Sequence, residues 1–499
     1  MPLLTRKKVL TIDRNRITTL PTTLDGAASA TNIVLEAVAK LDVERIDRQI
    51  ASTSLSSSKD LAGQKAVEFT FGIEMKGTNA GTGEPAWSKI LDGCGFTGEA
   101  ISSMVIGTIT AASTSTTFRH GETITGETSG ATATVVMDTH DGQLIIYYDT
   151  SSLAVGTFNG TEVIVGLDSG ATATTSTTAS AAGHAWWPIS SVEKKIIFVS
   201  GTGLTTALAV GDIIAGTSSG ARGIVTRAAS TGVSAIVYYN PIRGTFAGSE
   251  TMERVNNTAV GDIGDLESST AEQYEQFPTM GMKLFTDGKA ITGNNCRGNV
   301  VFNLEVNRPV RMDFSFRGAL ASTADTLFLT GIDYENVDPP LWESSAIGYA
   351  QNETAAESLL SDEFEPCLKT LSIDVGNQNS DRKCAGAASG LLEVATAARD
   401  GTGSMSVDDT LESDVGWLAR LQDNETARLR LTVGSVAGNK FTFSMPGVQF
   451  TDHGEGDENG IVTQDMSFRL TGGNLFDLRA NNALSANGGD NELVIIYHI

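Results

Sequence analysis

The pentapeptide GTSSG at residues 216–220 has the Gly-x-Ser-x-Gly pattern of a hydrolase nucleophile, which would make Ser218 attack an acyl carbon. The same register occurs as GETSG at 126–130 and GLDSG at 166–170, and alanine follows each copy. In the three copies, the position of the nucleophile is occupied by Thr128, Asp168 and Ser218. A turn tolerates this exchange, whereas a catalytic serine does not. The pattern therefore predicts a tight turn between strands.

Other motifs could also support chemistry. GCGFTG at 93–98 has the glycine spacing of a dinucleotide-binding loop, but it follows a helix-like segment instead of a strand. Paired carboxylates in 406–414 could act in glycoside hydrolysis. The acidic stretch 451–460 could bind calcium, although its spacing differs from that of an EF-hand loop. No zinc-ligand spacing joins the five histidines, His120, His140, His184, His453 and His498. We therefore expect an enzyme function to be absent, with no catalytic, cofactor-binding or metal-binding site.

Sequence repeats indicate the domain organisation. LIIYYDTSSLAVGTFNGTEVI (144–164) parallels AIVYYNPIRGTFAGSETM (235–252), which predicts two inserted β modules. In the rest of the chain, KVLTID (8–13) resembles KTLSID (369–374), and we interpret this and similar pairs as a duplicated domain. The predicted units are a first domain of residues 1–104 plus 266–345, inserted modules of 105–183 and 184–265, and a second domain of 346–499.

The strands of the two larger domains alternate between apolar and polar residues. Residues 66–77 place five apolar side chains on one face: Val67, Phe69, Phe71, Ile73 and Met75. A period of two indicates sheets with one packed face and one hydrated face. PAWSKILDG (85–93) and VGWLARLQD (415–423) each predict a short helix with a buried tryptophan. The expected fold class is mainly β, with two sandwich or barrel domains that each carry a short α-helix, plus two small β-rich modules.

The composition makes several partners improbable. The 499 residues include 35 basic and 59 acidic side chains, a net charge of −24, which disfavours stable binding to nucleic acid or to anionic membranes. No run of about eighteen apolar residues is present, so we expect no membrane-spanning helix. Four cysteines are too few for a disulfide framework, and we expect reduced, mostly buried thiols at Cys94, Cys296, Cys367 and Cys384.

The order of several motifs resembles the tail tube proteins of bacteriophages with long, non-contractile tails (siphovirus type). PAWSKILDGCGF (85–96) and DGKAITGNNCRGNVVF (287–302) carry most of the likeness, and GNKFTFSMPGVQF (438–450) is similar to the closing strands of that family. The likeness covers about residues 1–100 and 275–475. It implies a structural protein of the virion, made and assembled in the cytoplasm of the host bacterium. Its subunits would form stacked rings around a channel for genome ejection, on a β-sandwich with a helix and an inner β-barrel.

The resemblance also implies partners. Many members of the family contribute one domain to a six-membered ring, so a chain with two domains favours a trimer with pseudo-sixfold symmetry, with a hexamer as the alternative. The tape measure protein and other tail proteins would be further partners. DNA would pass through the lumen without stable binding, and the inserted modules would lie on the outside of the tube.

Two groups of residues are candidate sites within this interpretation. Candidates for an acidic channel wall are Glu68, Glu74, Asp408 and Glu412, whose charges would repel DNA over the screening length of about 8 Å. Candidates for an acidic loop between rings are Asp452, Glu455, Asp457 and Glu458. For any single residue, an ordinary hydrated carboxylate explains the sequence equally well. The competing hypothesis is a β-rich virion adhesin or glycan-binding decoration protein; a hydrolase with Ser218 comes third.

Overall fold

The protein is mainly β, as predicted: among the residues that the structure describes, 64% lie in strands and there are two short α-helices. The computed structural model describes the following residues: 8–15, 22–25, 32–48, 59–78, 84–101, 104–108, 123–138, 144–147, 162–166, 172–177, 183–188, 194–198, 203–209, 212–225, 229, 231–232, 235–243, 246–255, 261–266, 273–274, 279–332, 334–335, 337–343, 347–351, 367–410, 417–423, 426–436, 438–458, 460–471 and 492–499.

The largest sheet contains fifteen strands and falls into two groups. The first strand group consists of β1 (Lys8–Asn15), β2 (Leu35–Ile46), β3 (Leu61–Glu74), β19 (Thr279–Thr286), β20 (Lys289–Glu305) and β21 (Arg311–Asp325). The second strand group consists of β22 (Ile347–Gln351), β23 (Leu368–Asp374), β26 (Thr402–Asp408), β27 (Thr426–Val433), β28 (Lys440–Glu458), β29 (Ile461–Leu470) and β30 (Val494–His498). Antiparallel pairing of β20 with β23 joins the groups into one sheet.

One eight-strand path runs through both groups in the order β2-β3-β21-β20-β23-β26-β29-β28. Beyond it, β30 leads to β11 (Gly183–Pro188) and then to β4 (Phe96–Ile101), which follows the first helix directly. The segment before the first inserted β structure (β4) and the segment between the two inserted β structures (β11) therefore extend the second strand group.

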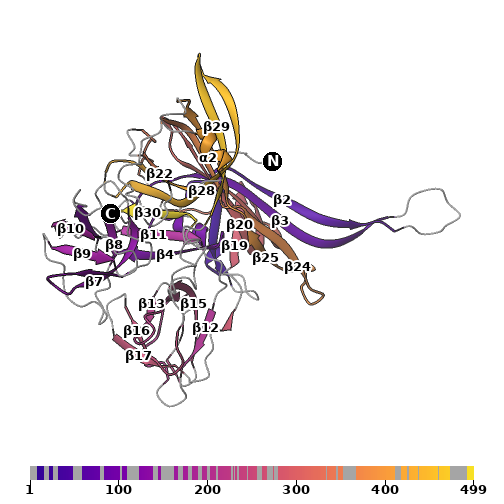
Figure 1. The fold of residues 1–499 in the computed structure, drawn as a ribbon. Helices are drawn as coiled ribbons and strands as arrows, with labels where there is room; N and C mark the ends of the chain where they lie inside the picture. The colour runs from indigo at the N-terminus through magenta and orange to yellow at the C-terminus, as the bar shows by residue number, and fades with distance from the viewer. Residues whose placement is uncertain are drawn as a thin grey trace.

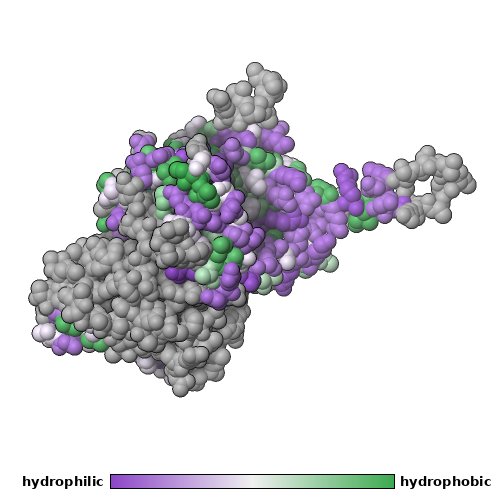
Figure 2. Space-filling model, turned by 45° about the horizontal axis from the view of Figure 1, so that its top comes forward, coloured by the Kyte–Doolittle hydropathy of each residue, from purple (hydrophilic) through white to green (hydrophobic). Residues whose placement is uncertain are grey.

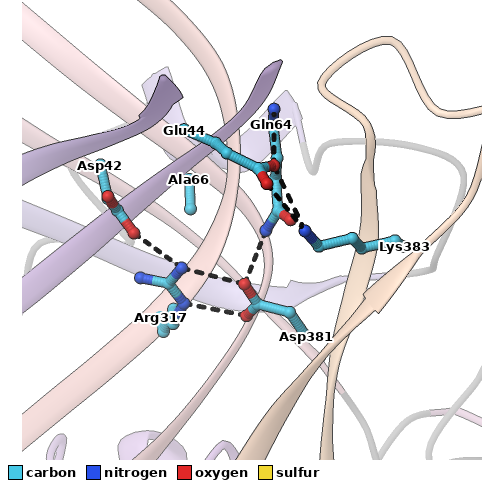
Figure 3. A pocket seen from close by; sticks show the side chains of 7 residues that line it. All are labelled: Asp42, Glu44, Gln64, Ala66, Arg317, Asp381 and Lys383. Atoms are coloured by element: carbon cyan, nitrogen blue, oxygen red, sulfur yellow. Dashed lines mark hydrogen bonds and ion pairs between the residues drawn. The ribbon is translucent and has the colours of Figure 1, made fainter. Parts of the chain in front are cut away.

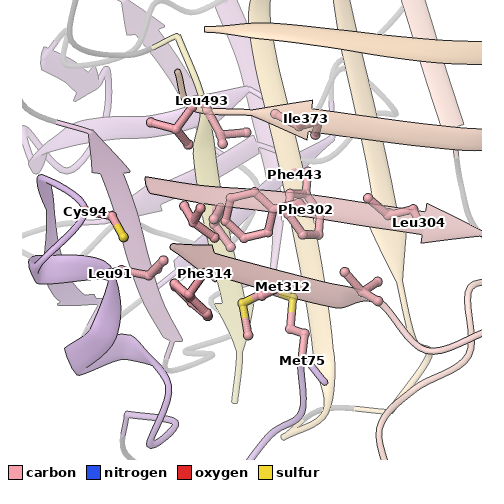
Figure 4. Close-up of a cluster of buried hydrophobic side chains, with 14 of the residues drawn as sticks. Met75, Leu91, Cys94, Phe302, Leu304, Met312, Phe314, Ile373, Phe443 and Leu493 are labelled. Carbon is pink, nitrogen blue, oxygen red and sulfur yellow. The ribbon is translucent and has the colours of Figure 1, made fainter. Parts of the chain in front are cut away.

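The largest hydrophobic cluster of the described residues is built by the strands of this sheet. The alternating residues of β3 are buried as predicted, with Phe69 and Phe71 at 0% and 4% exposure. Figure 4 shows side chains from both strand groups meeting there, including Phe302 of β20 and Phe443 of β28, whose ring centroids are 5.6 Å apart. The predicted helices are α1 (Ser88–Asp92) and α2 (Trp417–Gln422). Trp87 and Trp417 are buried beside them, which fixes each helix to the core.

Residues between β4 and β19 form two further β structures. One is a closed barrel of β5 (Met104–Thr108), β6 (Thr123–Gly126), β7 (Thr132–Asp138), β8 (Leu144–Tyr147), β9 (Val163–Gly166) and β10 (Thr172–Thr177). The other is a seven-stranded sheet of β12 (Lys194–Ile197), β13 (Ile213–Gly216), β14 (Arg222–Val225), β15 (Ile236–Arg243), β16 (Thr251–Arg254), β17 (Gly261–Asp265) and β18 (Gln273–Tyr274). In Figure 1 both structures lie on the same side of the large sheet.

Three hairpins are prominent at the other side of the molecule. The pair β2–β3, which we call the arm, projects farthest from the body, and β28–β29 points in a different direction (Figure 1). The third hairpin, β24 (Asn377–Lys383) and β25 (Leu391–Arg399), lies near the root of the arm. Hydrophilic residues cover most of the surface around that root in Figure 2, and hydrophobic residues appear toward the outer end of the arm.

Two expectations from the sequence require correction. Cys94 and Cys296 are buried, but Cys367 and Cys384 are exposed, because Cys367 directly precedes β23 and Cys384 lies at the tip of the β24–β25 hairpin. KVLTID and KTLSID also occupy different places: the first forms β1, which pairs with β19, whereas the second forms β23, which pairs with β20 and β26. Short similar strings can form strands with different neighbours, because pairing depends on the whole sheet.

Candidate functional site

The eight-strand path has one apolar face and one polar face. Residues directly opposite each other in antiparallel strands point to the same side of a sheet. One such row crosses six strands and consists of Glu74, Arg311, Asn303, Ser372, Ser404 and Ser467. The neighbouring row on the same face consists of Gly72, Asp313, Val301, Asp374, Thr402 and Arg469. We call this surface, which both strand groups build, the polar face.

The candidate wall residues that the structure describes lie on the polar face, where two of them form ion pairs. Glu68 accepts a hydrogen bond from Arg317 at 2.7 Å and lies 3.6 Å from the Nζ atom of Lys40. Asp408 lies 2.9 Å from the Nζ atom of Lys369. Glu74 is half-buried and stands opposite Arg311. Glu412 lies outside the described residues. The face therefore carries both signs of charge.

These ion pairs change the pKa values of their members. The hydrogen bond with Lys369 holds the pKa of Asp408 below its usual range. Asp408 therefore remains ionised at neutral pH. Hydrogen bonds with Glu36 and Asp313 raise the pKa of Arg311. Because cations lie beside these carboxylates, their charges are partly neutralised at short range.

The hairpin β24–β25 covers one end of the polar face. Leu391 and Val394 of β25 pack against Ala66 and Ala319 in a small buried cluster. Beside it, Glu393 is fully buried and lies 3.5 Å from Arg297, whose guanidinium also donates to the carbonyl of Val394. A buried charge is tolerated when it is paired and hydrogen-bonded. This end of the face is thus held by apolar contact and by a buried ion pair.

Residues 451–458 of the acidic stretch lie in a strand, so the prediction of a loop is wrong for them. β28 continues to Glu458 and pairs with β29 as far as the pair Glu458–Ile461. Asp452 stands opposite Ser467 on the polar face, whereas Glu455 and Asp457 stand opposite Gln464 and Val462 on the other face. Asp, Glu and Gly have low strand propensity, and the continuous ladder with β29 overrides it. The side chains of Asp452, Glu455 and Asp457 are exposed.

The GTSSG motif forms the predicted type of turn, between β13 and β14. Glu250 accepts hydrogen bonds from the backbone N–H groups of Ser218 and Ser219, at 3.2 and 2.9 Å, and from the Ser219 hydroxyl at 2.9 Å. Gly220 has a φ of +65°, which favours glycine. These contacts give the serines a structural role in the turn.

The GETSG turn between β6 and β7 has the same hydrogen bonds. Glu162 accepts from the N–H groups of Thr128 and Ser129, at 3.2 and 2.9 Å, and from the Ser129 hydroxyl at 2.8 Å. Gly130 also has a φ of +65°. The GLDSG copy lies mostly outside the described residues. Each described turn has its own glutamate about thirty residues later in the chain, and this glutamate accepts the hydrogen bonds of the turn. Sequence reasoning missed this signal.

No protein-family model matches the chain, and no curated protein shows significant similarity to it. Within the described ranges, no helix is long and apolar enough to cross a membrane, and no group of three or more His, Cys, Asp or Glu side chains could hold a metal ion.

Arg317 is the main residue of the polar face that sequence reasoning missed. It lies in RMDFSFRG, where alternation places it on the hydrated side. Its carboxylate partners come from β2, β3 and β24, and are 275, 249 and 64 residues away in the chain. The alternating pattern identifies such a residue as polar. Its partners become visible only when the sheet and the hairpin are placed together.

Proposed function

We propose that the chain is a structural, non-enzymatic subunit of a bacteriophage tail tube, in which copies form rings that stack around a channel for the genome. The observation that carries this proposal is the eight-strand path with its polar face. Both strand groups contribute to it. In the described part of the chain, β2 at one edge pairs only with β3, and residues 450–458 of β28 at the other edge pair only with β29. The motifs that resemble the tail tube family lie in the strands and helix of this part of the molecule.

The pairing scheme supports a duplicated domain. β1 pairs with β19 in the first strand group, and β22 pairs with β27 in the second. The strand after β19 is β20, which forms a hairpin with β21, and the strand after β27 is β28, which forms a hairpin with β29. The helices occupy matching places, with α1 after β3 and α2 after β26. In this scheme β2 corresponds to β23, and β20 corresponds to β28. The pairing of β20 with β23 inside one chain then predicts an equivalent pairing of β28 with β2 between two chains.

The open edges support ring formation. Among the described residues, β2 pairs only with β3, and positions 450–458 of β28 pair only with β29. Exposed strand edges readily pair with other chains. By correspondence with the β20–β23 junction, β28 of one copy pairs antiparallel with β2 of the next copy. Repetition of this contact closes a ring, and three chains give the pseudo-sixfold symmetry that the family resemblance implies.

Exposed apolar residues at opposite ends of the path support stacking of rings. The arm exposes Val38, Leu41, Ile46 and Leu61 at or beyond 42%. At the opposite end of the sheet along the strand direction, Val306 in the turn after β20 and Ile461 and Val462 at the start of β29 are exposed. Contacts between two different surfaces of the same chain produce open filaments when the rotation between copies does not close into a ring. The candidates Asp452, Glu455, Asp457 and Glu458 belong to the hairpin β28–β29, which we place between rings.

The polar face would be the channel wall. Its carboxylates outnumber its cations, and Glu305, Asp374 and Asp465 add to the wall residues that the sequence predicts. The partial neutralisation by arginines and lysines makes the wall mildly acidic. Such a wall resists stable adhesion of DNA, because it releases no condensed counterions from the phosphates.

Sedimentation velocity and negative-stain microscopy of the purified, full-length protein test the proposal. We expect annular particles or tubes that increase with protein concentration. If the protein remains monomeric at high concentration, and also in the presence of the other tail proteins, the proposal is wrong. Discrete monomers that bind glycans through the inserted modules would favour the adhesin hypothesis instead.

A further inference from the structure

The root of the arm contacts the β24–β25 hairpin around one arginine. A cavity of about 250 Å³ lies at this place. Figure 3 shows the side chains from β2, β3, β21 and β24 that line it. Its lining residues are Asp42, Glu44, Gln64, Ala66, Arg317, Asp381 and Lys383. Beyond the ladder that joins β3 to β21, the arm therefore meets the β24–β25 hairpin through charged groups.

Arg317 is the centre of these contacts. Its Nε and Nη2 atoms donate to both carboxylate oxygens of Asp381, each at 2.9 Å. Nη2 also donates to Asp42 at 2.8 Å, and Nη1 donates to Glu68 at 2.7 Å. One guanidinium thus joins carboxylates from β2, β3 and β24. Paired N–H groups in a planar fork fix the direction of a carboxylate as well as its distance.

Further contacts lie on either side of Arg317. Gln64 donates to Asp381 at 2.6 Å, and Lys383 lies 3.2 Å from Glu44. At the tip of the hairpin, the backbone N–H of Lys65 donates to the carbonyl of Ser389 at 2.9 Å. These groups connect both strands of the arm to the outer half of the hairpin.

The hairpin is itself held in one orientation, so it can serve as a fixed support. It bends away from β23 and β26 at Gly376, whose φ is +71°, and the Asp400 N–H donates to the Gly376 carbonyl at 3.0 Å. The buried pair of Arg297 and Glu393 then fixes β25 to β20. The arm has no comparable contact beyond its root among the described residues.

We propose that Arg317 is a positioning residue that sets the angle at which the arm leaves the sheet. The inference rests on the proposed function, because a fixed arm matters most where the arm docks on a second copy. An arm held in its bound orientation loses less conformational freedom on docking, which strengthens association. Arg317 itself stays at the root, where its guanidinium makes four hydrogen bonds within the chain.

Hydrogen–deuterium exchange of the unassembled, full-length protein tests the proposal. R317Q should raise the exchange of amides in 40–46, 61–66 and 378–383 at least tenfold, and leave β27 and β28 unchanged. R317K keeps the charge but not the three-carboxylate geometry, so it should give an intermediate increase. The matched control is R469Q, on the same face, because Arg469 also pairs with a carboxylate, Asp400, at 2.6 Å. It should leave the arm segments unchanged.

Unchanged exchange of the arm segments in R317Q would overturn the proposal, as would an equal increase in R469Q. If R317Q fails to fold, D381N provides the second variant. It removes the carboxylate charge of Asp381, which accepts hydrogen bonds from the Nε and Nη2 atoms of Arg317. Assembly is then measured separately. Failure of the wild type to form tubes would contradict the proposed function, while loosening of the arm in R317Q would still support the role of Arg317.

Discussion

The arm and the β24–β25 hairpin are two long hairpins that precede a short helix in their strand groups, yet they end in different environments. The hairpin bends at Gly376 and returns to the sheet, where Glu393 becomes fully buried. The arm continues outward and exposes apolar residues such as Leu61. Two features therefore distinguish the hairpins. The β24–β25 hairpin has a glycine at its bend and a buried ion pair, and it packs within its own chain. The arm has neither feature in its described residues and is available to another copy.

The largest expected effect comes from the buried ion pair of the hairpin. E393A leaves Arg297 buried without its carboxylate, and we expect the free energy of unfolding to fall by about 3–5 kcal/mol. Urea denaturation followed by tryptophan fluorescence measures this change. The control is R382A: Arg382 is also bound to Glu393, at 2.6 Å, but is half-exposed, so its loss should cost less than about 1 kcal/mol. Equal losses in the two variants would contradict the distinction.

The bend at Gly376 should give the next largest effect. A Cβ atom there would lie 1.9 Å from the carbonyl oxygen of Asp400, and the positive φ adds backbone strain. We expect G376A to destabilise the protein by about 2–4 kcal/mol. Gly331 has a similar φ of +74° but no neighbouring atom within 4 Å, so G331A should cost only about 1–2 kcal/mol. The difference between their urea midpoints isolates the steric contribution of the bend.

Acid should weaken the contact between the hairpin and the arm. Hydrogen bonds from Arg317 hold the pKa of Asp381 below its usual range. The resulting stabilisation is complete above the unfolded-state pKa of about 3.9 and is lost as the pH falls through the lowered folded-state value. The charged groups around this pair are Asp42, Glu44, Glu68 and Lys383.

Wild type and D381N can be compared by urea denaturation from pH 7 to pH 2. We expect their difference in stability to be constant at neutral pH and to shrink below about pH 4. A difference that persists at pH 2 would show that the lost carboxylate charge is not its cause. Salt of about 1 M should also reduce the difference, because both groups are partly exposed.

The smallest effect on stability is expected in the arm itself. V38K with L41K replaces two exposed apolar side chains, so the free energy of unfolding should change by less than about 0.5 kcal/mol for each site. The fraction of protein in tubes, measured by sedimentation, should nevertheless fall at least tenfold. V436K serves as the control, since Val436 is 68% exposed outside the arm. Normal tube formation in the double variant would exclude this part of the arm from the contact.

The strands and helices were the most predictable part of the molecule. Alternation in residues 66–77 and 311–318 predicts both the strands and their buried faces, because local sequence is sufficient when one face packs and the other is hydrated. The GTSSG turn was predictable for a similar reason, since glycine and serine act within a few residues. The sequence did not predict that β28 continues beyond residue 451, because the acidic residues and glycines of this segment have low strand propensity.

The candidate site was only partly predictable. The sequence assigned Glu68 and Asp408 to a polar surface, where they lie, but it did not predict their ion pairs with Arg317 and Lys369. These partners come from strands distant in the chain, and no local pattern specifies them. For the same reason, the exposure of Cys384 depends on a hairpin whose position only the folded sheet determines.

The central claim is that neighbouring copies join their sheets into a closed ring with the polar face inside. The most direct test is a two-dimensional class average of purified assemblies viewed along their axis by electron microscopy. We predict a closed ring with an open central channel and six similar densities, which three chains supply in pairs. A filled disc, an open arc or isolated single chains would contradict the claim.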